Sequence, residues 1–296
     1  MKVSELLRQT ARRFSRARLH YGHGTHSARE EAAWLISSVL GYLLEQDIAP
    51  AQARKIQALA SARIRTRKPL AYLLKEAWLG EHAFYVDERA IVPRSFIAEL
   101  LRDRLSPWLA REPKRVLDLC TGSGCLAVLL ALTFAEARVD AADLSAPALQ
   151  VARKNVARYK LKERVRLVKA DLFGSLGKYD LIVANPPYVT ANSMRRLPAE
   201  YRREPELALA AGKDGLDQVR RILAQAKEHL LPGGLLVCEI GGNRRSLERA
   251  YPKLEFAWPE TSEPGSVFML SAGQLPGGAR TAGRSRKRAR QAPARR

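Results

Sequence analysis

The stretch "VLDLCTGSGCLA", from Val116 to Ala127, decides the predicted fold of this chain. Its first residues form a short apolar run that predicts a buried strand, and its last residues begin the apolar run of a buried helix. Gly122 and Gly124 between them permit a tight turn and a close approach of the backbone to a ligand. Gly122-x-Gly124-x-x-Ala127 also fits a dinucleotide-binding fingerprint, although glycine turns without a ligand are about as common in α/β folds.

The order of strand, turn and helix repeats from Arg115 onward, and it predicts a parallel sheet covered by helices. A clear helix candidate, "SAPALQVARKNVARYK", follows Asp143. The last two strand candidates have no helix between them, so we expect them to form an antiparallel pair. The candidates are "RVLDL", "ARVDAAD", "RVRLVKA", "YDLIVA", "GLLVCEI", "KLEFAW" and "SVFMLSA". They predict an α/β fold with a seven-stranded Rossmann-like domain.

The regions around this domain have different compositions. Residues 1–75 predict a small helical domain, in which "SARE" (Ser27 to Glu30) has the form of a capping box. Residues 76–112 shift to aromatic and β-branched residues and predict a β-hairpin followed by a linking helix. Residues 113–272 form the predicted sheet domain. Residues 273–296 are so rich in Gly, Pro, Ala and Arg that we expect a disordered basic tail.

The charge of the chain favours polyanions as partners. Lys and Arg together number 51 against 30 acidic residues, which gives a net charge of +21. Eight basic residues and no acidic residue fall between Arg280 and Arg296. We weigh two interpretations of this tail, a solvated extension without a function and a segment that binds phosphates.

The composition predicts a cytoplasmic protein that does not contact a membrane. No apolar run reaches the roughly 18 residues that a membrane-spanning helix needs. The amino terminus is amphipathic without the features of a secretory signal, and Glu5 argues against a mitochondrial presequence. Cys120, Cys125 and Cys238 have no metal-ligand spacing, so a reducing compartment is the simplest interpretation.

In an open α/β sheet, ligands bind at the carboxyl ends of the strands, and four strand ends here carry unusual residues. The glycine turn is the first. Asp143 closes the next strand and can accept both ribose hydroxyls of a nucleoside, or it can cap the following helix, a role that Ser145 can also fill. Asp171 can accept the exocyclic amine of an adenine, with Leu172 or Phe173 against the ring, or it can serve a turn alone. Together these ends predict a bound nucleoside.

The fourth strand end is "VANPPYV", from Val183 to Val189. Two prolines stop a buried strand and fix the direction of the Pro186 carbonyl. A planar amide or an aromatic amine is a poor nucleophile because its nitrogen lone pair is delocalised. The Asn185 side-chain oxygen and the Pro186 carbonyl can each accept one hydrogen of such an NH2 group, while Tyr188 packs on its flat face. This arrangement predicts catalysis by positioning and fixed dipoles rather than by a strong base.

The residues favour S-adenosylmethionine over a nicotinamide as the nucleoside cofactor. A dehydrogenase needs a proton donor or acceptor near the hydride, and these loops contain no His and only Tyr188 and Lys169 as candidates. Asp118, four residues before Gly122, stands where methyltransferases place an acid near the cationic methionine end of their cofactor.

With these motifs the chain resembles the class I S-adenosylmethionine methyltransferases that have an Asn-Pro-Pro-Tyr motif, and within them the glutamine methyltransferases. Three stretches are similar to the branch that methylates a glutamine side-chain amide of ribosomal protein three of the large subunit (uL3). They are "HYGHGT" (His20 to Thr25), "AWLGEHAFYVDERAIVPRSFIAEL" (Ala77 to Leu100) and "LPAEYRREPELALAAGKDGLD" (Leu197 to Asp217). The sibling branch, which acts on peptide release factors, usually has Ile-Pro-Arg-Pro-Asp-Thr-Glu where this chain has "VPRSFIAE". Cys120 departs from the broad pattern Asp-x-Gly-x-Gly-x-Gly, because it occupies the first glycine position.

The resemblance covers about residues 1–272 and implies the roles of individual residues. The implied cofactor contacts are Asp118, Gly122, Gly124, Asp143, Asp171 and Asn185. The implied glutamine-binding residues are Asn185, Pro186, Pro187 and Tyr188, of which Asn185, Pro186 and Tyr188 are the catalytic group. Arg94, Ser95 and Phe96 are expected to line the cofactor cleft. The implied product is S-adenosylhomocysteine, and the implied partner is uL3 or its assembly intermediate, with ribosomal RNA as a further contact of the tail.

Two further features are interpreted as structural rather than chemical. His20, His23 and His26 are regularly spaced but lie in a glycine-rich loop without a nearby Cys or carboxylate, so a loop without a metal is expected. Glu239 ends a strand and is interpreted as a solvated or hydrogen-bonded acid rather than a catalytic one.

The sequence is also compatible with other functions. Release factors are the alternative glutamine substrate, and the adenine amino group of a nucleic acid presents the same NH2 chemistry. A protein of a different class, a ribosome-assembly factor that has kept the fold and lost turnover, is opposed by the intact glycine loop and Asn-Pro-Pro-Tyr turn. In the favoured interpretation, the helical domain, which has 14 basic and 6 acidic residues over residues 1–76, recognises the protein substrate.

Overall fold

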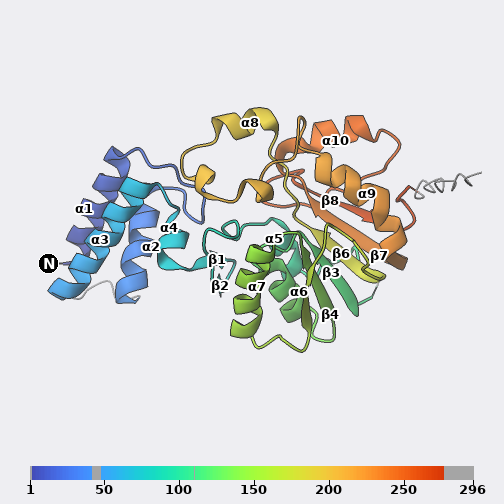
Figure 1. Ribbon diagram of the computed structural model, residues 1–296, viewed down its shortest axis with the longest axis horizontal. Helices are drawn as coiled ribbons and strands as arrows, with labels where there is room; N and C mark the ends of the chain where they lie inside the picture. The colour runs from blue at the N-terminus through green and yellow to red at the C-terminus, as the bar shows by residue number, and fades with distance from the viewer. Residues whose placement is uncertain (1, 42–47, 110, 277–296) are drawn as a thin grey trace, which may run out of the picture.

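The computed structural model describes residues 2–41, 48–109 and 111–276. Its amino-terminal part is a helical bundle, coloured blue to cyan in Figure 1. The bundle contains α1 (Val3–Arg16), α2 (Ala28–Leu40), α3 (Pro50–Thr66) and α4 (Leu70–Leu74), which pack around a core of their own. Ser27 caps α2 by accepting the Glu30 N–H at 3.2 Å, as predicted, whereas the Glu30 carboxylate accepts the N–H of His26 rather than that of Ser27.

The predicted hairpin follows the bundle. Strands β1 (Ala77–Leu79) and β2 (His82–Phe84) are antiparallel, which confirms the hairpin, although its strands are shorter than the aromatic stretch suggested. An irregular segment then leads to α5 (Ile97–Arg102), the linking helix.

The main sheet alternates strands and helices as predicted. Its elements are β3 (Arg115–Leu119), α6 (Cys125–Thr133), β4 (Arg138–Asp143), α7 (Ala146–Arg158), β5 (Val165–Lys169), β6 (Tyr179–Ala184), α8 (Ala191–Arg196), α9 (Asp217–His229), β7 (Leu230–Glu239), α10 (Arg244–Ala250) and β8 (Val267–Ser271). The strand order is β5-β4-β3-β6-β7-β8, parallel except for β8. One apolar core lies between one face of the sheet and α5 and α6, and a second lies between the other face and α9 and α10 (Figure 1).

The expected strand count is wrong by one, because within the described residues the sheet has six strands rather than seven. "KLEFAW" contributes only an isolated bridge between Ala257 and Met269, and β8 pairs with β7 instead. The Glu255 carbonyl accepts the side-chain amide of Gln274 at 3.0 Å rather than a strand partner. Phe256 packs edge-on against the Phe268 ring at 5.1 Å, so the apolar residues of this stretch serve packing rather than pairing.

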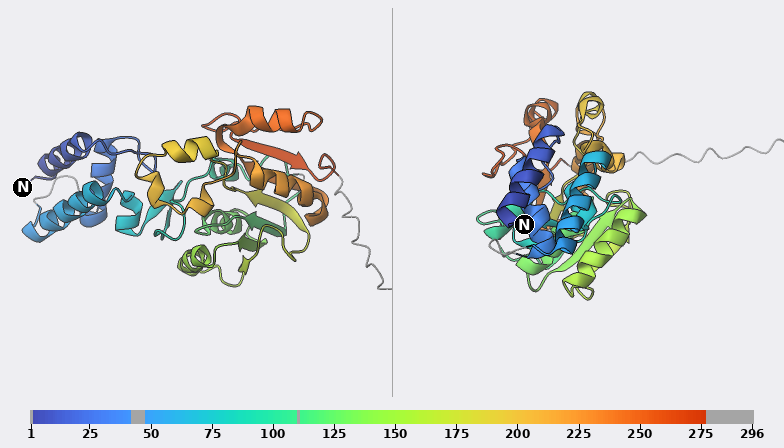
Figure 2. Two further views of the ribbon diagram at one scale, coloured as in Figure 1. Left: turned by 45° about the horizontal axis from the view of Figure 1, so that its top comes forward. Right: turned by 90° about the vertical axis from the view of Figure 1, so that its left-hand side faces the viewer.

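The segment after β6 lies between the bundle and the sheet (Figure 2). It contains α8 and two short 3-10 turns, Tyr201–Arg203 and Glu206–Ala208. The buried carboxylate of Glu200 in this segment accepts hydrogen bonds from Arg63 and Arg67 at 3.3 and 3.2 Å, which ties the segment to helix α3 and the residue that follows it.

The end of the described chain differs in one respect from the prediction. Leu275 is only 1% exposed and packs into the second core, and its carbonyl accepts a hydrogen bond from Lys227. The packed region therefore extends beyond residue 272. The basic residues of the predicted tail, from Arg280 to Arg296, lie outside the described residues. Within the described parts, the structure contains no helix that combines the length and the apolar character needed to cross a membrane.

Candidate active site

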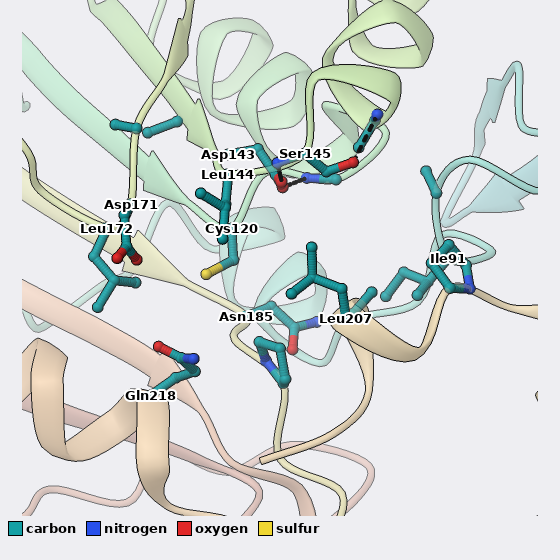
Figure 3. Close-up of a pocket in the computed structure, with 18 of the residues that line it drawn as sticks. Ile91, Cys120, Asp143, Leu144, Ser145, Asp171, Leu172, Asn185, Leu207 and Gln218 are labelled. Carbon is teal, nitrogen blue, oxygen red and sulfur yellow. Dashed lines mark hydrogen bonds between the residues drawn. The ribbon is translucent and has the colours of Figure 1, made fainter.

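A cavity opens at the carboxyl ends of β3, β4, β5 and β6, and all four predicted strand ends contribute to its wall (Figure 3). It encloses about 830 Å³ of empty space, counting the part that opens to solvent. Among the residues predicted from sequence to contact a ligand, those that line it are Gly122, Asp143, Asp171, Leu172, Asn185 and Pro187.

The glycine loop serves two different purposes. Gly122 has a φ of 55° and lines the cavity, where its N–H donates to the Asp143 carboxylate at 2.8 Å. Gly124 does not line the cavity, and a Cβ there would lie 2.9 Å from the Cβ of Ala152, so glycine at this position permits the close approach of α6 and α7. Cys120 has a φ of 58°, a left-handed conformation that favours glycine, and its side chain points into the cavity (Figure 3).

Asp143 is held by backbone donors and not by a cation. Its two oxygens accept the N–H groups of Gly122 and Ser145, both at 2.8 Å. Ser145 is the N-cap of α7 and accepts the Ala148 N–H at 3.2 Å, so the alternative role of Asp143 as the helix cap does not apply. Burial raises the pKa of Asp143, and the two backbone hydrogen bonds oppose this shift.

Asp171 is exposed at the opposite side of the cavity. Its carboxylate pairs with Arg221 at 2.8 Å, and this hydrogen bond lowers its pKa. Of the two apolar neighbours considered from sequence, Leu172 lines the cavity, whereas Phe173 is fully buried and stacks on the ring of His229 at 4.4 Å. Of these two side chains, only Leu172 is therefore available to a ring in the cavity.

Asp118 lies behind the glycine loop and does not line the cavity. It is 0% exposed, and one of its oxygens accepts the Thr121 hydroxyl at 2.5 Å. Its other oxygen, Oδ1, has no hydrogen-bond partner among the described residues. Burial raises the pKa of Asp118 to about 7 against the effect of the Thr121 hydrogen bond.

The Asn-Pro-Pro-Tyr turn presents an oriented amide to the cavity. The Asn185 Nδ2 donates to the carbonyl of Arg94 at 3.2 Å. A carbonyl can only accept a hydrogen bond, so this contact requires the NH2 group of Asn185 on that side and leaves Oδ1 free as an acceptor. Pro186 is buried and Pro187 lines the cavity.

Tyr188 lies beside the cavity rather than in its wall. Its hydroxyl donates to the Glu239 carboxylate at 3.3 Å, and its ring is packed so closely on Gly241 that a Cβ there would lie 2.8 Å from it. Glu239 is 1% exposed, so it is a hydrogen-bonded strand-end acid and not a solvated one. Burial raises its pKa, and hydrogen bonds from Ser95 and Phe96 oppose this shift.

Arg94, Ser95 and Phe96 do not line the cavity, contrary to the prediction. The Arg94 guanidinium points to Glu204, with two contacts of 2.7 Å, and Ser95 and the N–H of Phe96 bond to Glu239. This segment therefore lies behind the reactive turn instead of facing the cofactor cleft.

Sequence reasoning missed the apolar side chains of the cavity. Leu144 and Leu207 both line it and are 48% and 56% exposed. Leu144 carries a weak signal in the sequence, because it directly follows the strand-end Asp143. Leu207 carries none, since only the folded chain brings its segment across the cavity (Figure 3).

The loop that contains His20, His23 and His26 makes contacts within the protein. His23 is 3% exposed and lies 3.5 Å from the Glu204 carboxylate and 4.3 Å from the Tyr201 ring. The backbone N–H of His20 donates to Glu200 at 3.2 Å. In the described part of the chain, no three His, Cys, Asp or Glu residues are arranged to hold a metal ion.

Comparisons with known proteins agree with this architecture. The family model described as "Methyltransferase small domain" matches residues 98–199. A ribosomal protein uL3 glutamine methyltransferase from Burkholderia pseudomallei is 48% identical, with 93% of this chain and 95% of that protein covered. The protein of the same name from Neisseria meningitidis serogroup B is 50% identical, with 93% and 94% covered.

One solved structure shows the same fold. The catalytic domain of hMettl16, in complex with the MAT2A 3'UTR hairpin 6, superposes with a TM-score of 0.51 at 17% identity. The match covers 81% of this chain and 91% of that one. At this identity the similarity establishes the fold, which is that of the methyltransferases.

Proposed function

The chain belongs to the ribosomal protein uL3 glutamine methyltransferases, and from this premise we propose the reaction of its own cavity. The protein transfers the methyl group of S-adenosylmethionine to the side-chain amide nitrogen of a glutamine in uL3 and releases S-adenosylhomocysteine. The observation that carries the proposal is the oriented amide of Asn185 at the edge of a cavity that suits a nucleoside.

The residues of the cavity fit this cofactor. The Asp143 carboxylate has no ion-pair partner among the described residues and suits ribose hydroxyls, and Asp171 suits the exocyclic amine of adenine. Leu144, Leu172 and Leu207 supply apolar surface for a flat ring. Gly122 permits close approach of the backbone. Asp118 is buried behind the loop with one oxygen unpaired among the described residues, and a positively charged cofactor in front of it would favour the ionised form of this carboxyl, whose pKa is raised to about 7.

The turn provides the chemistry by positioning. When bound, the cofactor supplies an electrophilic methyl group on a sulfonium. The Asn185 Oδ1 and the Pro186 carbonyl accept the two hydrogens of the substrate amide, which directs the nitrogen lone pair into the cavity. A carbon–nitrogen bond forms as the carbon–sulfur bond breaks, and the nitrogen then loses one proton to water.

Purified protein, cofactor and recombinant uL3 test this proposal directly. We expect mass spectrometry of peptides to find one methyl group on a glutamine of uL3. A peptide release factor serves as the matched alternative substrate, because it is the target of the sibling branch. Methylation of the release factor and not of uL3 would reassign the substrate, and no transfer to either would favour an assembly factor without turnover.

The basic tail extends the proposal to ribosomal RNA. The eight basic residues between Arg280 and Arg296 bind RNA phosphates and bring the enzyme to uL3 on an assembling subunit. Truncation after residue 276 preserves the buried Leu275. It should leave the rate on isolated uL3 unchanged and flatten the salt dependence of binding to RNA-containing particles. Equal binding of full-length and truncated protein at low salt would mean that the tail is a solvated extension.

A further inference from the structure

Two side chains of the Asn-Pro-Pro-Tyr turn are tied to one short segment, residues 92–96: Asn185 bonds to it directly, and Tyr188 is linked to it through Glu239. We infer that this segment is a positioning element for methyl transfer, clamped by the buried carboxylates of Glu204 and Glu239. The inference rests on the proposed function. It gives Arg94 and the two glutamates roles as positioning residues, which act through the turn and do not touch the substrate.

Glu204 holds the first half of the segment. It is 5% exposed, and it accepts the Val92 N–H at 2.9 Å and both Arg94 guanidinium donors at 2.7 Å. The two parallel hydrogen bonds of this pair fix direction as well as distance. Burial raises the pKa of Glu204, but Arg94 and His23 outweigh this effect and lower the pKa to about 2, so the clamp is charged at neutral pH.

Glu239 holds the second half and also reaches the turn. One of its oxygens accepts the Ser95 hydroxyl at 2.6 Å and the Phe96 N–H at 3.0 Å. Its other oxygen accepts the Tyr188 hydroxyl at 3.3 Å. A single buried carboxylate thus joins the segment to the tyrosine of the turn.

The carbonyl of Arg94 lies between the two clamps and orients Asn185. Because this carbonyl accepts the Asn185 Nδ2 at 3.2 Å, it selects one of the two orientations of the amide. The opposite orientation would turn an NH2 group toward the substrate NH2, leaving two donors face to face. Displacement of a reacting group by about 1 Å can cost about a hundredfold in rate, so the clamp has a large effect on turnover.

The position of the ion pair supports this role. Glu204 is fully buried and the Arg94 side chain is 27% exposed, so the desolvation cost of the carboxylate offsets much of the attraction and the pair adds little net stability. Arg94 and Glu204 lie 110 positions apart in sequence and form this pair directly behind the reactive turn. The position of this ion pair is therefore better explained by a role in orienting the turn than by a contribution to stability.

A double-mutant cycle tests the inference. Arg94→Lys keeps the charge and the backbone carbonyl but replaces a bidentate contact with a single-point one. We expect it to lower kcat on uL3 by roughly ten- to a hundredfold, with little change in cofactor affinity. In an Asn185→Ala background the same substitution should change kcat by less than about twofold, because its effect passes through Asn185. Arg166→Lys, which replaces a second bidentate arginine at the far end of the sheet, is the matched control and should leave kcat unchanged.

A second measurement does not depend on activity. NMR of isotopically labelled asparagine side chains follows the Asn185 amide, whose signal is assigned by its loss in Asn185→Asp. Arg94→Lys and Glu204→Gln should each shift and broaden this signal in folded protein, and Arg166→Lys should not. If wild-type protein fails to methylate uL3, the proposed function is wrong. The NMR result still shows whether Arg94 and Glu204 orient the Asn185 amide. An equal fall in kcat on both backgrounds, or an unchanged Asn185 signal in folded Arg94→Lys and Glu204→Gln, overturns the inference.

Discussion

Strand β4 carries two aspartates, three positions apart, whose surroundings differ sharply. Asp140, toward the amino end of the sheet, pairs with both donors of Arg166 at 2.7 Å and accepts the Tyr179 hydroxyl at 2.6 Å. Burial raises the pKa of Asp140, but these hydrogen bonds outweigh it and the pKa is lowered. Asp143, at the carboxyl end, accepts only backbone N–H groups and its pKa is raised by burial.

The difference separates a structural end of the sheet from a ligand-binding end. The sheet edge around Asp140 is rich in basic side chains, of which Arg166 pairs with the acid and Arg115 also lowers its pKa. These basic side chains are Arg115, Arg138, Lys162, Arg164 and Arg166. At the carboxyl end, Asp143 has no cation partner among the described residues, and it lines the cavity. An acid that is not neutralised by its own protein is available to the hydroxyl groups of a ligand.

The largest expected effect comes from the turn at the carboxyl end. Asn185→Ala removes one oriented acceptor and should lower kcat by about a hundred- to a thousandfold, or about 2.7–4 kcal/mol. Cofactor affinity, measured by calorimetry, should change much less. A kcat near that of the wild type would mean that the turn has no part in the mechanism. The comparison between the amino and carboxyl ends of the sheet would then lose its functional basis.

A pH-dependent stability is expected from Asp118 in the cofactor-free protein. Its pKa is raised to about 7, so the folded state keeps a proton that the unfolded chain loses near pH 4. The associated stability is complete below about pH 4 and is lost as the pH rises to about 7. Relative to Asp118→Asn, the free energy of unfolding of wild type should fall by about 2–4 kcal/mol across this window. Urea denaturation at several pH values measures this, and parallel pH profiles of the two proteins contradict it.

The two aspartates of β4 allow a direct test of the comparison. Asp143→Ala should weaken S-adenosylmethionine binding by about ten- to a hundredfold, because charge-assisted hydrogen bonds contribute roughly 1.5–3 kcal/mol. Asp140→Ala should leave cofactor affinity unchanged. Calorimetry on both folded variants gives the answer, and equal affinities for the two variants would mean that Asp143 does not bind ribose.

The smallest effect is expected at the amino end. Arg166 is exposed, so Arg166→Ala should reduce the free energy of unfolding by about 0.2–1 kcal/mol, and less at high salt. Activity should not change. A loss of several kcal/mol in thermal or chemical denaturation would show that this ion pair does more than neutralise Asp140.

Much of the fold follows from local sequence. The alternating apolar runs and glycine turns predicted β3 to β7 and the helices between them, because side-chain periodicity and turn chemistry act over a few residues. "KLEFAW" was mispredicted as a strand for the same reason. Its residue pattern is that of a strand. In the folded protein, however, the Gln274 side chain donates a hydrogen bond to the Glu255 carbonyl, and the Phe256 ring packs against Phe268.

The features of the site also fall into two groups, those that follow from local sequence and those that depend on tertiary packing. The sequence by itself determined the four strand ends, since parallel strands bring their carboxyl ends to one edge and place Gly122, Asp143, Asp171 and Asn185 together. Only the tertiary structure decided that Phe173 turns into the core, that Leu207 crosses the cavity and that Arg94 points to Glu204. These contacts join residues far apart in the chain. Their geometry depends on how whole elements pack, which no local pattern encodes.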